Sequence, residues 1–206
     1  MSAKDQSLDA FLSDLASSLP SPGGGGAAAL CGALAAGLAS MVVALSAGKK
    51  QCFAHEAELS ELGIRAEAAR LELLALIDAD AEAFAPLSRA YSLPKDTPNR
   101  AEILESCLRQ AASAPKKIAD ACCEVIELAE GCAACGSRLV LSDAATAAVL
   151  AKGALRGAVI NVKVNTVLMR ERQFADALSA ELEEKEREYA VRADAVCDAV
   201  AVALGF

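Results

Sequence analysis

Apolar side chains recur three and four residues apart along most of this chain, which is the spacing of one face of an α-helix. The longest such pattern predicts a helix over residues 56–91, and only Asp80 interrupts its apolar stripe. The stripe consists of Leu59, Leu62, Ala66, Ala69, Leu73, Leu76, Phe84 and Leu87. Helical geometry therefore places one carboxylate on the apolar face of a long helix.

The same spacing predicts further helices. They cover residues 101–114, 115–130, 143–170 and 174–204, after a short first helix with Leu8, Phe11, Leu12 and Leu15 as its apolar positions. Pro115 suits the first turn of the helix that it begins, and Ser142 or Asp143 can cap the next one. The inward positions expected in the last helix are Leu178, Leu182, Tyr189, Val196 and Val200. Because aromatic residues and β-branched runs are few, we expect an all-α fold, a single-domain helical bundle over residues 1–206.

Residues 27–47 contain no charged side chain, and a segment of that length could cross a bilayer. It is mostly Ala, Gly and Ser, which gain little on transfer to lipid, and no second span follows. We therefore interpret it as a buried central Ala/Gly-rich helix and expect no membrane partner. Small residues recur four apart along it, in the rows Ala28, Gly32, Ala36, Ser40 and Ala29, Ala33, Gly37. Such rows let helices approach closely, within one chain or between two copies, and they favour a homodimer.

The net charge of -8 argues against a sequence-independent grip on nucleic acid. Eight unevenly spaced cysteines without an N-terminal signal peptide predict reduced thiols and a cytoplasmic location. Cys132 and Cys135 have the spacing of one metal-binding pair, but a structural zinc site uses two such pairs, so we expect no metal. His55 is the only histidine, and no nucleophile accompanies it in the sequence. We do not expect it to act directly.

Ser21 and Pro22 precede four glycines, Gly23, Gly24, Gly25 and Gly26. Such a run suits a sharp turn or a close approach to a ligand. A helix that begins after it would direct its free N–H groups and positive dipole end at the turn, which favours an anionic ligand. The Lys-Ser or Lys-Thr that follows a phosphate-binding loop is absent. The alternative is a plain turn between helices.

Lys49 and Lys50 follow the other end of the predicted central helix, about 30 Å from the glycines at 1.5 Å per residue. Only a long ligand could contact both the glycines and the lysines of one straight helix. The alternative is an antiparallel helix of a second subunit that brings the lysines of one copy to the glycines of the other. That arrangement predicts a site at a dimer interface.

Asp80 is the strongest candidate for chemistry. Burial raises the pKa of a carboxyl toward the range useful for proton transfer. A structural ion pair with a lysine or arginine is the alternative, because a buried charge needs a partner.

Gly153, Gly157, Asn161 and Asn165 recur four apart on the helix that begins near Asp143. A glycine inside a helix costs about 1 kcal/mol relative to alanine, so we expect something to need the space at both glycines. The two amides suit a flat polar heterocycle. Close helix packing with surface amides is the alternative.

Four groups of residues, in order from about residue 8 to residue 170, resemble the cyclodeaminase/cyclohydrolase family of folate one-carbon metabolism. They are the Ser-Pro-Gly run with Gly48-Lys49-Lys50, Asp80-Ala-Glu-Ala-Phe84, Leu93-Pro-Lys-Asp96, and Ser142-Asp-Ala144 with Leu155-Arg-Gly-Ala158 and Asn161-Val-Lys-Val-Asn165. The chain departs from the family at Gly26, where relatives often carry serine.

The resemblance implies an enzyme that acts on the one-carbon unit of tetrahydrofolate without a further cofactor. A cyclohydrolase adds water to 5,10-methenyl-tetrahydrofolate and gives 10-formyl-tetrahydrofolate, whereas a cyclodeaminase closes 5-formimino-tetrahydrofolate and expels ammonia. The absence of a fused formiminotransferase domain favours the cyclohydrolase. A helical dimer that binds folate, or acts as a scaffold, without catalysis is a more distant alternative.

The resemblance also implies roles for individual residues. Asp80 is the expected catalytic carboxylate, with Asp143 as the second choice. Asn161 and Asn165 would hold the pterin. The anionic glutamate tail would meet Lys49, Lys50 and the run Ser21, Pro22, Gly23, Gly24, Gly25 and Gly26.

Overall fold

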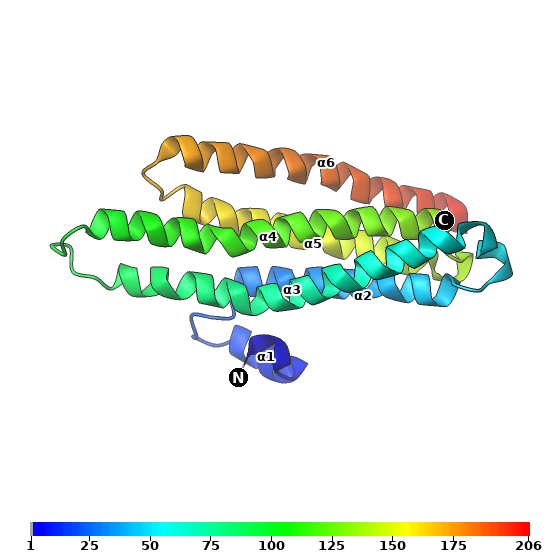
Figure 1. Ribbon diagram of the computed structural model, residues 1–206, viewed down its shortest axis with the longest axis horizontal. Coiled ribbons are helices and arrows are strands. Elements are labelled where there is room, and N and C mark those ends of the chain that lie inside the picture. The colour runs from blue at the N-terminus through cyan, green and yellow to red at the C-terminus, as the bar shows by residue number, and fades with distance from the viewer. Residues whose placement is uncertain (1) are drawn as a thin grey trace.

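The computed structural model describes residues 2–206, and within that range every regular element is a helix (Figure 1). The α-helices are α1 Leu8–Leu15, α2 Gly24–Ser46, α3 Glu56–Tyr91, α4 Arg100–Cys135, α5 Leu141–Thr166 and α6 Arg172–Leu204. Short 3-10 helices are η1 Ala3–Asp5, η2 Lys50–His55 and η3 Arg138–Val140. The prediction of an all-α bundle is therefore confirmed.

The long helices lie along one common direction, with α2 packed against α3, α4 and α5 (Figure 1). Helix α6 covers the outer side of α4 and α5. The short α1 lies outside the bundle near the start of α2, and the preceding segment is held by Asp78 of α3, which accepts hydrogen bonds from the Ser2 hydroxyl and, at 2.7 Å, from the Ala3 amide. This arrangement places one end of α2 beside the middle of α3 and the last turns of α5.

The predicted apolar positions agree best with the buried positions in the helix whose apolar stripe is longest. Helix α3 has the predicted bounds, and every member of its stripe is buried except Phe84, which is partly exposed. In α6, four of the five expected inward positions are buried, and Tyr189 is partly buried. The predicted first helix is present as α1, but its apolar side is poorly covered: Leu8 is 63% and Leu12 50% exposed, and only Phe11 is buried. That helix has too few neighbours to cover its apolar side.

Pro115 does not begin a helix as predicted. It lies inside α4, which runs without a break from Arg100 to Cys135. A proline inside a helix removes one hydrogen bond, here the one to the carbonyl of Ala111. Both residues are buried, and packing against α3 and α5 keeps the helix continuous in spite of this loss.

Helix α2 is the central helix, but one side of it is not covered. About half of its residues are buried, including most of the two small-residue rows. Its exposed side carries large apolar side chains, with Leu34 at 57%, Met41 at 37% and Leu45 at 46% exposure.

Two segments of the described chain are long and apolar enough to cross a membrane, Gly24–Ser46 and Arg138–Thr166, whereas only the first was expected from the sequence. About half of each apolar window is buried inside the bundle, as in the core helix of a folded domain.

Candidate active site

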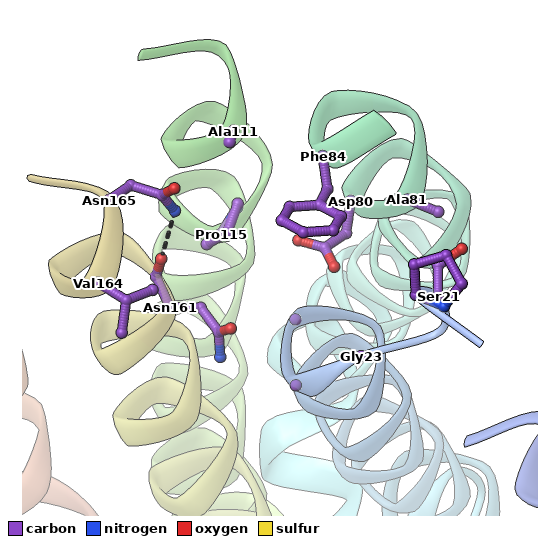
Figure 2. Close-up of a pocket in the computed structure, with 13 residues that line it drawn as sticks. Ser21, Gly23, Asp80, Ala81, Phe84, Ala111, Pro115, Asn161, Val164 and Asn165 are labelled. Atoms are coloured by element: carbon purple, nitrogen blue, oxygen red, sulfur yellow. Dashed lines mark hydrogen bonds between the residues drawn. The ribbon is translucent and has the colours of Figure 1, made fainter. Parts of the chain in front are cut away.

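A cleft of about 190 Å³ lies where the first turn of α2 meets α3, α4 and α5 (Figure 2). The lining residues are Pro20, Ser21, Gly23, Gly24, Gly25, Asp80, Ala81, Phe84, Ala111, Pro115, Asn161, Val164 and Asn165. Three segments that the sequence analysis singled out, the glycine run, Asp80 and the asparagine pair, therefore meet at one place.

The glycines form the first turn of α2 rather than a sharp turn before it. Gly23 is the N-cap residue, Gly24, Gly25 and Gly26 are helical, and none of the four has a positive φ. The Ser21–Pro22 peptide bond that precedes them is cis. The glycines are thus not needed for an unusual backbone conformation, and the expectation of a sharp turn is wrong at these positions.

What two of these positions require is the absence of a side chain. A Cβ at Gly25 would lie 2.2 Å from Oδ1 of Asp80, and a Cβ at Gly24 would lie 3.0 Å from Nδ2 of Asn161. A Cβ at Gly26 would make only ordinary contacts, 3.5 Å from Pro22 and 3.8 Å from Ile77. The helix start therefore approaches Asp80 and Asn161, two of the polar side chains of the cleft, at van der Waals distance, as a close-approach role for glycine requires.

Asp80 extends from α3 toward the N-terminal end of α2 (Figure 2). Burial raises the pKa of its carboxyl above the ordinary value, and a backbone hydrogen bond from Gly26 acts in the opposite direction. No charged side chain among residues 2–206 contributes to this shift. The carboxylate thus lacks the lysine or arginine partner that a structural ion pair would supply, and the positive end of the α2 dipole is its nearest electrostatic support.

The two asparagines project from α5 on the opposite side of the cleft (Figure 2). Nδ2 of Asn161 donates to the carbonyl of Gly157, and Nδ2 of Asn165 donates to the carbonyl of Asn161, both at 2.8 Å. These bonds to the preceding turn fix both amide groups and leave their Oδ1 atoms as acceptors for a ligand.

The expectation that something needs the space at both α5 glycines is wrong. A Cβ at Gly153 would meet nothing within 4 Å, and a Cβ at Gly157 would make an ordinary contact of 3.5 Å with Ala28. The glycines that a close approach requires are on α2.

Phe84 belongs to the cleft, although the spacing placed it in the buried stripe of α3. It follows Asp80 by one helical turn, and its ring lies beside the carboxylate (Figure 2). The position four residues after Asp80 is the signal that could have identified it. Ala111, Pro115 and Val164 complete the apolar wall of the cleft, and only the helix-breaking character of Pro115 marked any of these in the sequence.

The remaining predicted site residues lie elsewhere. Pro22 and Gly26 are adjacent in sequence to lining residues but do not themselves line the cleft. Lys49 and Lys50 follow the C-terminal end of α2, where Nζ of Lys49 is 3.4 Å from the Ser137 hydroxyl. Asp143 is in the first turn of α5, about 27 Å of helix from Asn161. Within one chain, the predicted site is therefore divided between the two ends of α2.

The known proteins that this chain resembles belong to one family. A model of the family described as formiminotransferase-cyclodeaminase matches residues 7–184. The chain is 42% identical over 185 residues to methenyltetrahydrofolate cyclohydrolase of Methylorubrum extorquens, covering 88% of this chain and 89% of that protein. It is 36% identical over 176 residues to formimidoyltransferase-cyclodeaminase of Mus musculus, covering 84% of this chain but only 32% of that longer protein.

A solved structure has the same fold. The crystal structure of formiminotetrahydrofolate cyclodeaminase from Thermotoga maritima matches with a TM-score of 0.83 and 26% identity. The match covers 98% of this chain and 97% of that one.

Proposed function

This chain belongs to the formiminotransferase-cyclodeaminase family, and we propose that it is a methenyltetrahydrofolate cyclohydrolase, which converts 5,10-methenyl-tetrahydrofolate and water to 10-formyl-tetrahydrofolate. The observation that carries the proposal is the partly buried Asp80 carboxylate, which faces the cleft without a cationic partner among the described residues. A methenyl cation supplies the missing positive charge. The similarity to a cyclohydrolase over nearly the whole of both chains favours this reaction over the deaminase reaction.

One wall of the cleft can stack on the face of the pterin ring, and the opposite wall can hydrogen-bond to its edge. The Phe84 ring provides an aromatic surface for stacking, and the Oδ1 atoms of Asn161 and Asn165 provide acceptors for its N–H groups. Because these side chains project from different helices, the ring would be held between α3 and α5 with its bridging carbon toward Asp80.

Asp80 would serve the reaction twice. Its negative charge stabilises the cation and orients a water molecule, whose oxygen bonds to the bridging carbon while one proton passes to the carboxylate. When the bond from that carbon to N5 breaks, the protonated Asp80 returns the proton to N5. The remaining hydroxyl proton leaves to solvent as the formyl carbonyl forms. A carboxyl whose pKa is raised by burial suits both transfers.

The reaction is tested by giving the purified protein each substrate separately. We expect faster loss of the methenyl absorbance of 5,10-methenyl-tetrahydrofolate and no ammonia from 5-formimino-tetrahydrofolate. Ammonia release without accelerated hydrolysis would replace the proposal by the cyclodeaminase reaction, for which the Mus musculus and Thermotoga maritima relatives are named. Folate binding without either reaction would overturn both.

We also propose that the working unit is a homodimer in which two α2 helices pack antiparallel. Gly37 lies twelve residues from Gly25 and twelve from Lys49, so a crossing at Gly37 sets the partner subunit's Lys49 level with Gly25. A Cβ at Gly37 would meet nothing within 4 Å, and the surrounding groove is lined mainly by apolar side chains. A close crossing there would cover the exposed side of α2.

This register would join the two halves of the predicted site. The lysines of one subunit would approach the helix start of the other, where the anionic glutamate tail of the substrate would extend from the cleft. All eight cysteines of the described chain are free, which fits a reducing compartment and supports a cytoplasmic location.

Subunit mixing tests the shared site. Asp80→Asn and the double variant Lys49→Ala/Lys50→Ala should each be weakly active alone. After unfolding and refolding together in equal amounts, half of the dimers are mixed and hold one intact site, so activity should recover to about a quarter of the parent value. A mixture no more active than its components would rule out a site shared between subunits.

A further inference from the structure

Three side chains with metal-binding atoms converge at the end of the bundle away from the cleft. His55 ends η2, Glu58 is in the first turn of α3, and Cys135 is the last residue of α4. Nδ1 of His55 is 2.6 Å from Oε2 of Glu58, and the Cys135 thiol donates to the same oxygen at 3.1 Å. All three atoms lie within 4.8 Å of one another. About 33 Å of α3 separates Glu58 from Asp80, so this cluster is not part of the cleft.

The cluster is more than an exposed ion pair. The His55–Glu58 contact joins side chains that are 43% and 62% exposed, and such pairs contribute little to stability. What distinguishes it is the third group, a thiol from a different helix aimed at the same carboxylate oxygen. Two donors thus converge on one acceptor, from η2 and from α4, at the point where α3 begins.

We propose that His55, Glu58 and Cys135 bind a divalent transition metal ion of the zinc class. An imidazole nitrogen, a carboxylate oxygen and a thiolate are the ligand types that zinc uses, whereas calcium and magnesium prefer oxygen alone. Zinc-ligand bonds of about 2.0–2.3 Å in tetrahedral geometry hold the donor atoms about 3.3–3.6 Å apart. The separations of Oε2 from Nδ1 and from Sγ, 2.6 and 3.1 Å, need to grow by less than about 1 Å, and the separation of Nδ1 from Sγ, at most 4.8 Å, needs to shrink by at most about 1.2 Å. Partly exposed side chains can accommodate such shifts.

Charge and protons balance in this site. The thiol gives up its proton to solvent, the imidazole takes the tautomer with its proton on Nε2 and binds through Nδ1, and the carboxylate is already ionised, so one proton is released for each ion bound. The thiolate and the carboxylate together neutralise the two positive charges of the ion. The fourth coordination position would face solvent.

The site is not the one that cysteine spacing suggested. Cys132 is buried, and its thiol donates to the carbonyl of Ala39 at 3.6 Å, whereas Cys135 contacts Glu58. The two thiols of the Cys-Ala-Ala-Cys segment therefore have different partners. An ion bound to Cys135 would instead connect the end of α4 with the segment that directly follows Lys49 and Lys50.

Cobalt(II) is the most direct probe, because a thiolate bound to it gives a charge-transfer absorption band in the near ultraviolet. We expect the reduced full-length protein to develop this band with one equivalent of Co²⁺ and to lose it when Zn²⁺ is added. Cys135→Ser should remove the band. His55→Ala should weaken Co²⁺ binding at least about tenfold. If Cys135→Ser fails to fold, the His55→Ala variant tests the site instead, and unchanged Co²⁺ binding by it would overturn the proposal.

Cys197→Ser is the matched control, because Cys197 is a partly buried thiol on α6 outside the cluster and its loss should leave the band unchanged. Zn²⁺ should also raise the Tm of the parent by about 5 °C at saturating concentration, and not that of Cys135→Ser. No band in the parent protein, or an equal band in Cys135→Ser, would overturn the proposal. Neither result depends on catalytic activity, so the test is separate from that of the proposed reaction.

Discussion

Replacing Gly25 by alanine should greatly lower the catalytic activity without unfolding the protein. The new Cβ would lie 2.2 Å from Oδ1 and 2.4 Å from Oδ2 of Asp80, about 1 Å short of ordinary contact. The atoms that must move belong to the end of a side chain, so the carboxylate can retreat without displacing α3. Alanine is also the better helix former, by up to about 1 kcal/mol.

The cost should therefore appear in catalysis rather than in stability. A displacement of about 1 Å from a productive geometry lowers rates by about 100-fold, which corresponds to about 2.7 kcal/mol of transition-state stabilisation. The assay is kcat/KM for loss of 5,10-methenyl-tetrahydrofolate, with Tm measured on the same samples. We expect kcat/KM of Gly25→Ala to fall about 100-fold and its Tm to stay within a few degrees of the parent.

Gly26→Ala is the matched control, because it adds the same methyl group one residue later. Its nearest contacts would be ordinary ones, 3.5 Å from Pro22 and 3.8 Å from Ile77. This variant should keep kcat/KM within about twofold of the parent, since no reacting group moves. Equal activity of the two alanine variants would refute the argument that Gly25 positions Asp80.

Three further variants test the ring stacking, the dimer face and the burial of Asp80. Phe84→Ala should raise KM about tenfold through loss of stacking on the pterin, and an unchanged KM would place the ring elsewhere. Leu34→Glu puts a charge on the exposed side of α2 and should halve the mass measured by light scattering, whereas Val202→Glu on α6, a position 82% exposed, should leave it unchanged. Asp80→Asn should raise Tm at neutral pH, because the pKa of the folded carboxyl is raised above its unfolded value and its charge then destabilises the fold. That gain should shrink as pH falls toward 3.8, its ordinary pKa, and a gain independent of pH would contradict the burial argument.

Much of the fold could be predicted, because most helices bury a stripe that the sequence displays. Helix α3 is the best example, since its apolar stripe persists although the helix contains one glycine, Gly63, and one proline, Pro86. The start of α2 could not be predicted, because a run of glycines has low helix propensity and only its contacts with Asp80 and Asn161 show why the helix begins there. Pro115 was misplaced for a similar reason, since packing overrides the local preference to begin a helix.

The candidate site was predictable in part. Asp80 was marked by its place on an apolar face, and the asparagine pair by its spacing on one helix. The connection of Lys49 with the glycines could not be established, because one chain holds them at opposite ends of α2. The cluster of His55, Glu58 and Cys135 was also hidden, since only the packing of α3 against α4 brings the thiol to the other two.

The most direct test of the proposed function is the rate of 5,10-methenyl-tetrahydrofolate hydrolysis by the parent protein and by Asp80→Asn, each at saturating substrate. Amide replacement keeps the size of the side chain and removes its charge and its ability to carry a proton. We expect the parent to accelerate hydrolysis and Asp80→Asn to lose about 100-fold or more of that acceleration. Full activity in Asp80→Asn, or no acceleration by the parent, would contradict the proposed function.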